Sequence, residues 1–196
     1  INLMDFNCDQ RNDVHFFYTL PFSKTKALVE TTWLSHLEDQ SLMDYDLQLE
    51  NYIKNNLGIK NYKINFTEKG AIPLFYPSIK NDKKVINIGS AGGMTRLSTG
   101  YTFLNIQEHS KYIVKNIDKI NEVKIFDLGK KYHFLDKVFL RVLKKYPEKM
   151  PKIFSNMFKT SSNTIIKFLS NKSNLIEDIK IINKMPKLIF LKALFN

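Results

Sequence analysis

The chain has 196 residues, 43% of them hydrophobic and 25% charged, which is the composition of a globular protein and argues against disorder. Its single cysteine, Cys8, excludes a disulfide framework and a zinc site built from cysteines, and no apolar run is long enough to cross a bilayer. The net charge of +11 arises in residues 111–196, which hold 19 Lys or Arg against 7 Asp or Glu. Only 3 of the 30 basic residues are arginines, and this excess of lysine favours binding to a generic anionic surface over base-specific binding of nucleic acid.

Two strands joined by a short turn are predicted near the N-terminus. The aromatic and β-branched run Val14–Leu20 ends at Pro21, and the run Lys26–Leu34 alternates as a half-buried strand does. The alternation places Glu30 on the face opposite Trp33. We therefore expect an antiparallel pair that carries a carboxylate on one face.

A helix and a further strand are predicted next. An apolar stripe at helical spacing predicts a helix over residues 42–57, with Ser41 as its N-cap and Gly58 as the residue that ends it. Tyr62–Phe66 is predicted to be a strand, which leads into a corner at residues 68–73 that glycine and proline punctuate.

The following segment is rich in glycine. Val85–Ile88 is predicted to be a short buried strand, followed by GSAGG, by STGY at residues 98–101, and by a helix with one apolar face: Ile106, Ile113, Ile117 and Ile120. Glycines after a strand let the backbone approach a ligand, and amides at a helix start favour an anionic or polar group. The dinucleotide pattern GxGxxG is absent, and a tight turn without a ligand is the alternative.

The rest of the chain is predicted to be helical and basic. Prolines and Ser/Asn clusters separate five predicted helices: His133–Tyr146, Pro151–Phe158, Ser162–Leu169, Asn174–Asn183 and Lys187–Phe195. Their lysines and apolar side chains, such as Leu188, Leu191, Leu194 and Phe195, suit docking on an anionic membrane. Two alternatives stay open: the helices only cover the protein core, or the lysine content reflects an AT-rich genome.

Glu30 and Glu68 are the carboxylates whose setting points to chemistry. Glu30 lies in an apolar strand, where a carboxylate is costly unless it is paired, protonated or functional. The alternatives are that Glu30 faces water at the sheet surface and that Glu68 is an exposed turn acid. The histidines (His15, His36, His109 and His133) have no metal-ligand spacing, so no metal is assigned, and Cys8 is expected to be a free thiol in a reducing compartment.

Several sequence blocks occur in an order that resembles a known family. FFYTLPFSKTKALVETT, EKGAIPL and IGSAGGMTRLSTGYTFLNIQ, and in the tail FLDKVFLRVL, IFSNMF, IIKFLS and IINKMPKLIFLKAL, look like successive C-terminal blocks of the bacterial lycopene β-cyclases. The resemblance extends from Met4 onward and covers essentially the whole chain.

The resemblance implies an α/β fold, α+β in this fragment. The chain would be the C-terminal part of a Rossmann-type FAD/NAD(P)-binding flavoprotein, with an antiparallel substrate-domain sheet and a helical C-terminal region. Residues 1–80 are implied to belong to the substrate-binding sheet domain, 81–125 to the strand, turn and helix that close on FAD, and 126–196 to the basic helical region. Because the GxGxxG segment is missing and the chain opens at Ile1, we interpret it as a fragment without a signal peptide, inactive alone. The implied location is cytoplasmic and peripheral to the membrane.

The implied activity is the cyclisation of lycopene ends to β-rings. An acid protonates the terminal double bond, a neighbouring double bond attacks the carbocation, and loss of a proton completes the ring. The family uses reduced FAD, with NADPH as the electron source, although no electrons are transferred overall. The implied partners are membrane-dissolved lycopene and an anionic membrane surface, and no nucleic acid is expected.

Carried over position by position, the family's acid falls on Glu30, as general acid or as the base that takes a proton back. The implied cofactor-binding residues are Gly89, Ser90, Ala91, Gly92, Gly93, Thr99, Gly100 and Tyr101, and the implied cavity-shaping residues are Glu68 and Pro73. Ser90 stands where the wider flavoprotein group often has an acid, and Leu97 where the family usually has proline.

Two other functions stay open. One is a related flavoprotein reductase or hydroxylase that acts on another isoprenoid, and product mass separates it from a cyclase, since cyclisation leaves mass unchanged. The other is a non-catalytic basic helical module that binds membranes or nucleic acid, and nucleic-acid binding would fall steeply with added salt.

Overall fold

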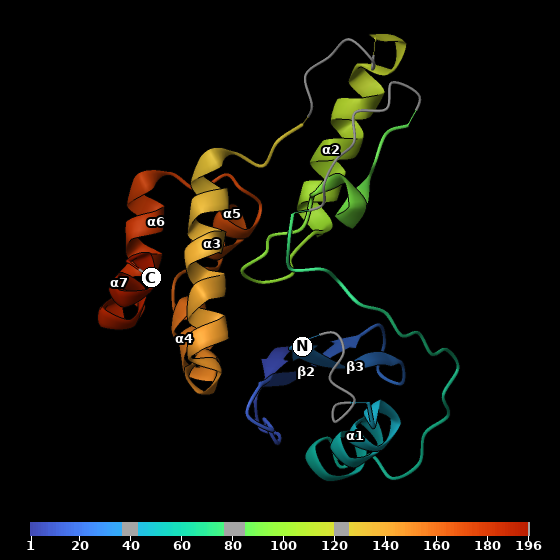
Figure 1. Cartoon of the computed structure of the whole chain (residues 1–196). Coiled ribbons are helices and arrows are strands. Elements are labelled where there is room, and N and C mark those ends of the chain that lie inside the picture. The colour runs from blue at the N-terminus through green and yellow to red at the C-terminus, as the bar shows by residue number, and fades with distance from the viewer. Residues whose placement is uncertain (37–42, 77–84, 120–125, 196) are drawn as a thin grey trace. The chain divides into compact units, whose positions relative to one another are not determined.

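The computed structural model describes residues 1–36, 43–76, 85–119 and 126–195. The chain divides into two compact units. The first comprises residues 1–71 and 147–151, and the second comprises residues 72–146 and 152–196. Figure 1 shows strands together with a helix in the first unit and helices in the second.

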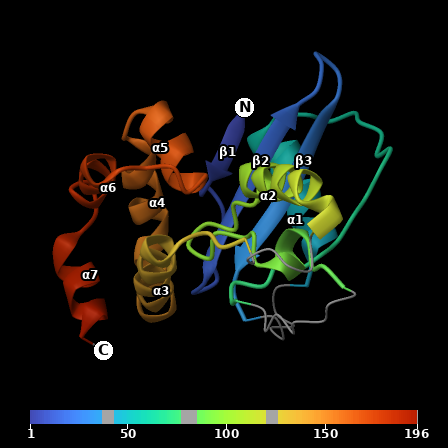
Figure 2. The same ribbon diagram turned by 90° about the horizontal axis from the view of Figure 1, so that it is seen from above.

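An antiparallel sheet organises the first unit. Its strands are β1 (Asn2–Asp5), β2 (Val14–Pro21) and β3 (Ala27–Leu34), with β2 in the centre. Figure 2 shows the strands side by side in this order. Pairing between β2 and β3 is unbroken over all 8 residues of each strand. The predicted antiparallel pair is confirmed, with ends that differ by one residue.

Helix α1 (Tyr45–Asn51) covers one face of this sheet (Figure 1). The ring of Tyr52 stacks on Phe17 with 4.0 Å between centroids. The amide oxygen of Gln48 accepts hydrogen bonds from Thr31 Oγ1 at 2.8 Å and from Trp33 Nε1 at 3.0 Å. Aromatic stacking and hydrogen bonds to a buried amide thus hold the helix on the odd-numbered side chains of β2 and β3.

The ends of this helix differ in part from expectation. The helix begins at Tyr45 and continues beyond Asn51 as a π-helical segment, Tyr52–Asn56. Gly58 follows with φ +69°, a left-handed conformation that glycine adopts without strain, which fits its predicted role as the terminating residue. The predicted N-cap Ser41 lies outside the described residues.

Two predicted strands are wrong. Tyr62–Phe66 is irregular and exposed, with Ile64 67% and Phe66 71% accessible, and Val85–Ile88 is also irregular, with Ile88 64% accessible. Neither run pairs with a neighbour among the described residues. A strand needs a partner for its backbone groups, and apolar composition alone does not supply one.

The second unit is built from helices (Figure 1). Their bounds are α2 (Phe103–Lys115), α3 (Lys130–Lys145), α4 (Met150–Phe158), α5 (Ser162–Leu169), α6 (Leu175–Ile182) and α7 (Lys187–Leu194), with short 3-10 helices at Gly89–Gly92, Ile117–Lys119 and Pro147–Lys149. The five C-terminal helices are confirmed, with boundary shifts of up to three residues. The helix after the glycine segment is also present, but it ends at Lys115, so the predicted face residue Ile117 lies in the following 3-10 helix and is 58% accessible. Ile120, predicted on the face of α2, lies outside the described residues.

The core of this unit forms around α3. Phe139 of α3 lies with its ring centroid 5.4 Å from that of Phe154 in α4 and 6.0 Å from that of Phe190 in α7. Val142 and Phe154 are fully buried. The molecule is therefore a mixed α/β structure with a three-stranded antiparallel sheet and several helices.

Candidate functional site

Glu30 lies in the middle of β3, directly opposite Tyr18 of β2. The Tyr18 hydroxyl donates a hydrogen bond to Glu30 Oε2, and Thr32 Oγ1 donates to Glu30 Oε1 at 3.3 Å. All three side chains share the sheet face opposite α1, because even-numbered residues of the paired strands point to that face. Each carboxyl oxygen of Glu30 thus has a hydroxyl donor.

The surroundings of this group are apolar. The same face carries Val14, Phe16 and Leu20 on β2, and Leu28 and Leu34 on β3. Val14 and Phe16 are buried, and Glu30 is half-buried. The prediction that Glu30 and Trp33 face opposite ways is confirmed. A hydrogen-bonded acid beside apolar side chains can deliver a proton to an apolar molecule.

Burial raises the pKa of the Tyr18 hydroxyl well above its ordinary value, and its hydrogen bond to Glu30 and the charges of Glu30 and Glu68 raise it further. Loss of the phenolic proton would place a second negative charge beside the carboxylate. The phenol therefore stays protonated and remains a donor to Glu30.

Tyr18 and Thr32 were not singled out from the sequence, although a signal for them existed. A hairpin that turns at residues 22–26 pairs position 18 with position 30, and Thr32 shares a strand face with Glu30. The alternation of the strand places Thr32 on the same face as Glu30, and the length of the turn identifies Tyr18 as the residue opposite Glu30.

The predicted cofactor segment forms a 3-10 helix and a turn in the second unit. Gly89, Gly93 and Gly100 have φ of +60°, +77° and +71°. Residues other than glycine adopt such positive φ values only with strain. A Cβ on Gly92 would lie 2.6 Å from the carbonyl oxygen of Asn87, so this glycine permits a close approach of the chain to itself.

The turn that follows is fixed by its own hydrogen bonds. Thr99 N and Gly100 N donate to the carbonyl oxygen of Arg96, at 3.2 and 2.8 Å, and Tyr101 N donates to Thr99 Oγ1 at 3.3 Å. The Ser98 hydroxyl is buried and has no hydrogen-bond partner in the described part of the chain. A buried hydroxyl without a partner is costly, and a ligand oxygen or nitrogen would satisfy it. This orphan hydroxyl, with three left-handed glycines around it in sequence, fits a polar cofactor group.

The two predicted cavity-shaping residues fall in different units. Glu68 belongs to the first unit and is exposed, as the alternative of a turn acid expects, and its charge contributes to the high pKa of Tyr18. Pro73 belongs to the second unit and is half-buried.

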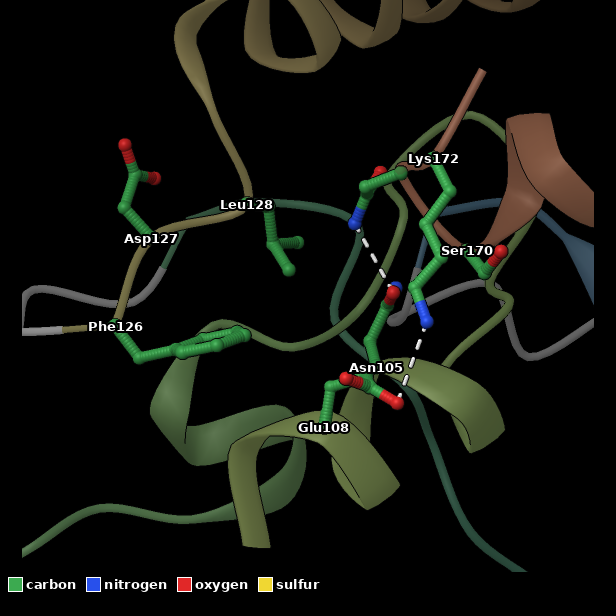
Figure 3. A pocket seen from close by; sticks show the side chains of 8 residues that line it. Asn105, Glu108, Phe126, Asp127, Leu128, Ser170 and Lys172 are labelled. Atoms are coloured by element: carbon green, nitrogen blue, oxygen red, sulfur yellow. Dashed lines mark hydrogen bonds and ion pairs between the residues drawn. The ribbon is translucent and has the colours of Figure 1, made fainter. Parts of the chain in front are cut away.

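A cavity of about 150 Å³ in the second unit was not predicted (Figure 3). Asn171 Nδ2 donates to Asn105 Oδ1 at 3.0 Å across it, and Lys172 Nζ lies 3.3 Å from Glu108 Oε1. Phe126 and Leu128 form its apolar side. Since these polar groups are already paired with one another, the cavity offers a ligand few free partners.

The described residues contain no group of three or more His, Cys, Asp or Glu side chains that could hold a metal ion. The described helices include none that is long and apolar enough to span a bilayer.

Comparison with family models identifies the family. The model described as lycopene cyclase protein matches residues 1–194, and the chain belongs to this family. No curated protein and no solved structure is significantly similar to the chain. Family membership indicates carotenoid cyclisation as the activity and lycopene as the substrate.

Proposed function

We propose that the chain carries the acid that starts the cyclisation of lycopene ends to β-rings, and that Glu30 is this acid. The observation that supports the proposal is the carboxyl of Glu30, which Tyr18 and Thr32 bind on an otherwise apolar sheet face. An apolar polyene can approach such a face, and a fixed acid there can protonate it.

The proposed reaction conserves atoms and electrons. The Glu30 carboxylic acid transfers its proton to the terminal double bond, which leaves a carboxylate and a tertiary carbocation. The next double bond in reach attacks the cation and a six-membered ring closes. A proton then leaves the ring, and the Glu30 carboxylate is a base that can take it back, so the acid is regenerated without net redox change.

Reduced FAD, kept reduced by NADPH, is the cofactor in this proposal, and it supplies negative charge that stabilises the cation. The residues proposed to hold it are Gly89, Ser90, Ala91, Gly92, Gly93, Thr99, Gly100 and Tyr101. The left-handed glycines and the orphan hydroxyl of Ser98 support this assignment. Glu68 and Pro73 are proposed to shape the cavity for the substrate.

Docking on an anionic membrane is the proposed route to the substrate, and it makes the enzyme a peripheral protein of the cytoplasmic face. Helices α6 and α7 expose large apolar side chains, with Leu175 71%, Ile176 67% and Leu188 74% accessible. Lys180, Lys184 and Lys187 are exposed among them. Apolar side chains flanked by lysines suit the boundary between headgroups and acyl chains.

The test uses the complete coding sequence, expressed in cells that accumulate lycopene. The pigments are separated by chromatography and their masses are measured by mass spectrometry. Wild type is expected to give a product of unchanged mass that elutes as a ringed carotenoid. Glu30→Gln, which keeps the size of the side chain and cannot donate an acidic proton, is expected to leave lycopene.

Glu50→Gln is the matched control, because Glu50 is an exposed carboxylate on α1 that pairs with Lys54. It is expected to behave as wild type. Ring formation by Glu30→Gln would overturn the acid assignment. A wild-type product of altered mass would instead indicate a reductase or hydroxylase.

A further inference from the structure

We infer that Tyr18 is a positioning residue for Glu30, whose hydroxyl binds the carboxylate that remains after proton transfer and so strengthens the acid toward a carbon–carbon double bond. The inference rests on the proposed role of Glu30 and adds to it a residue from another strand.

The geometry of the pair supports this role. Tyr18 and Glu30 are directly opposed in the β2–β3 register, and the Tyr18 hydroxyl donates to Oε2. Thr32, on the same strand as Glu30, donates to Oε1 at 3.3 Å. Each carboxyl oxygen of Glu30 therefore has its own hydroxyl donor, and Tyr18 is the donor supplied by the neighbouring strand.

The electrostatics keep Tyr18 in the donor state. Burial, the hydrogen bond to Glu30 and the charges of Glu30 and Glu68 all raise the pKa of its phenol. A phenol with a raised pKa is too weak an acid to protonate a carbon–carbon double bond. Its role is therefore to donate a hydrogen bond to Glu30.

The chemistry makes such a donor valuable. An alkene is a very weak base, so its protonation needs an acid whose conjugate base is stabilised as the proton leaves. Negative charge grows on the carboxylate in the transition state, and a hydrogen bond to a charged acceptor is about twice as strong as one to a neutral acceptor. Tyr18 therefore stabilises the transition state more than the ground state, which raises kcat rather than lowering KM.

The test compares Tyr18→Phe with wild type, using the complete purified protein with reduced FAD and lycopene in phosphatidylcholine vesicles. Loss of the hydroxyl is expected to lower kcat roughly 10- to 100-fold and to leave KM unchanged, because the ring stays in place. A fall in kcat at an unchanged KM is a result that mere misfolding does not produce, because a misfolded site would also lose affinity for lycopene.

Tyr52→Phe is the matched control. Its hydroxyl also donates to a carboxylate, Asp5 Oδ2 at 2.7 Å, but its ring packs on the α1 side of the sheet. It is expected to leave kcat and KM unchanged. If Tyr18→Phe keeps the wild-type kcat, or raises KM as much as it lowers kcat, the inference is wrong. If Glu30→Gln is active, the proposed function fails instead, so the two failures are distinguishable.

Discussion

Arg96 and Asp136 form an ion pair with no exposure to solvent: Arg96 Nη2 lies 2.7 Å from Asp136 Oδ1. The Leu97 amide donates to Asp136 Oδ2 at 3.0 Å, and Arg96 Nη1 donates to the Phe168 carbonyl and to Asn171 Oδ1. The side chain of Arg96 thereby joins the turn that follows the glycine segment to α3 and to the end of α5.

Breaking this pair is expected to destabilise the second unit. Asp136→Asn keeps the side-chain size but leaves the guanidinium buried without a counter-charge, which costs about 3–5 kcal/mol in the free energy of unfolding. Urea unfolding followed by far-UV circular dichroism measures it, because the sole tryptophan, Trp33, reports on the first unit only. Glu148→Gln, at an exposed ion pair with Lys149, is expected to cost less than about 1 kcal/mol. Equal losses in the free energy of unfolding of the two variants would show that burial does not make the Arg96–Asp136 pair more important for stability than an exposed pair.

Gly92→Ala is expected to reduce both stability and flavin content. Its Cβ would lie 2.6 Å from the Asn87 carbonyl oxygen and 3.1 Å from the carbonyl carbon, so backbone must move. Overpacking of this kind costs about 1–3 kcal/mol and displaces the neighbouring glycines. The measurement is the absorbance of flavin released from the complete purified protein.

Gly70→Ala is the control for this variant, because a Cβ there meets no atom within 4 Å and its φ lies outside the left-handed region. If Gly92→Ala loses stability but keeps its full flavin content, the glycine segment does not bind the cofactor.

Charge reversal on the C-terminal helices is expected to weaken membrane binding. The double variant Lys184→Glu and Lys187→Glu removes two lysines, each worth about 1 kcal/mol at an anionic surface, so affinity for phosphatidylserine vesicles is expected to fall at least roughly 30-fold. Vesicle sedimentation measures this.

Lys24→Glu with Lys26→Glu changes the net charge equally in the exposed β2–β3 turn, and is expected to retain binding. A similar fall in both double variants would mean that total charge, rather than the α6–α7 surface, governs binding.

Periodicity predicted the elements whose backbone hydrogen bonds join residues close in sequence. The β2–β3 hairpin and the helices α3 to α7 follow from patterns that a short window contains. Tyr62–Phe66 and Val85–Ile88 have the composition of strands, yet composition carries no information on whether a partner strand lies beside them. Strand identity depends on such non-local pairing.

The site was predictable in part for the same reason. Glu30 stands out as an acid in an apolar strand, and Tyr18 follows from the hairpin register. Arg96 and Asp136 are 40 residues apart in sequence, and no local pattern connects them. Their pairing depends on how α3 packs against the turn at residues 94–101, which only the folded chain defines.

The β2–β3 turn, closed by hydrogen bonds from Phe22 N and Ser23 N to the Lys26 carbonyl, has a consequence for how the sequence can vary. Side chains of a strand alternate faces at every step, so inserting or deleting one residue in this turn would slide β3 by one position and rotate Glu30 toward α1. The residue types in the turn can therefore vary, but the number of residues cannot. Active relatives are expected to differ there by substitution and not by single-residue gaps.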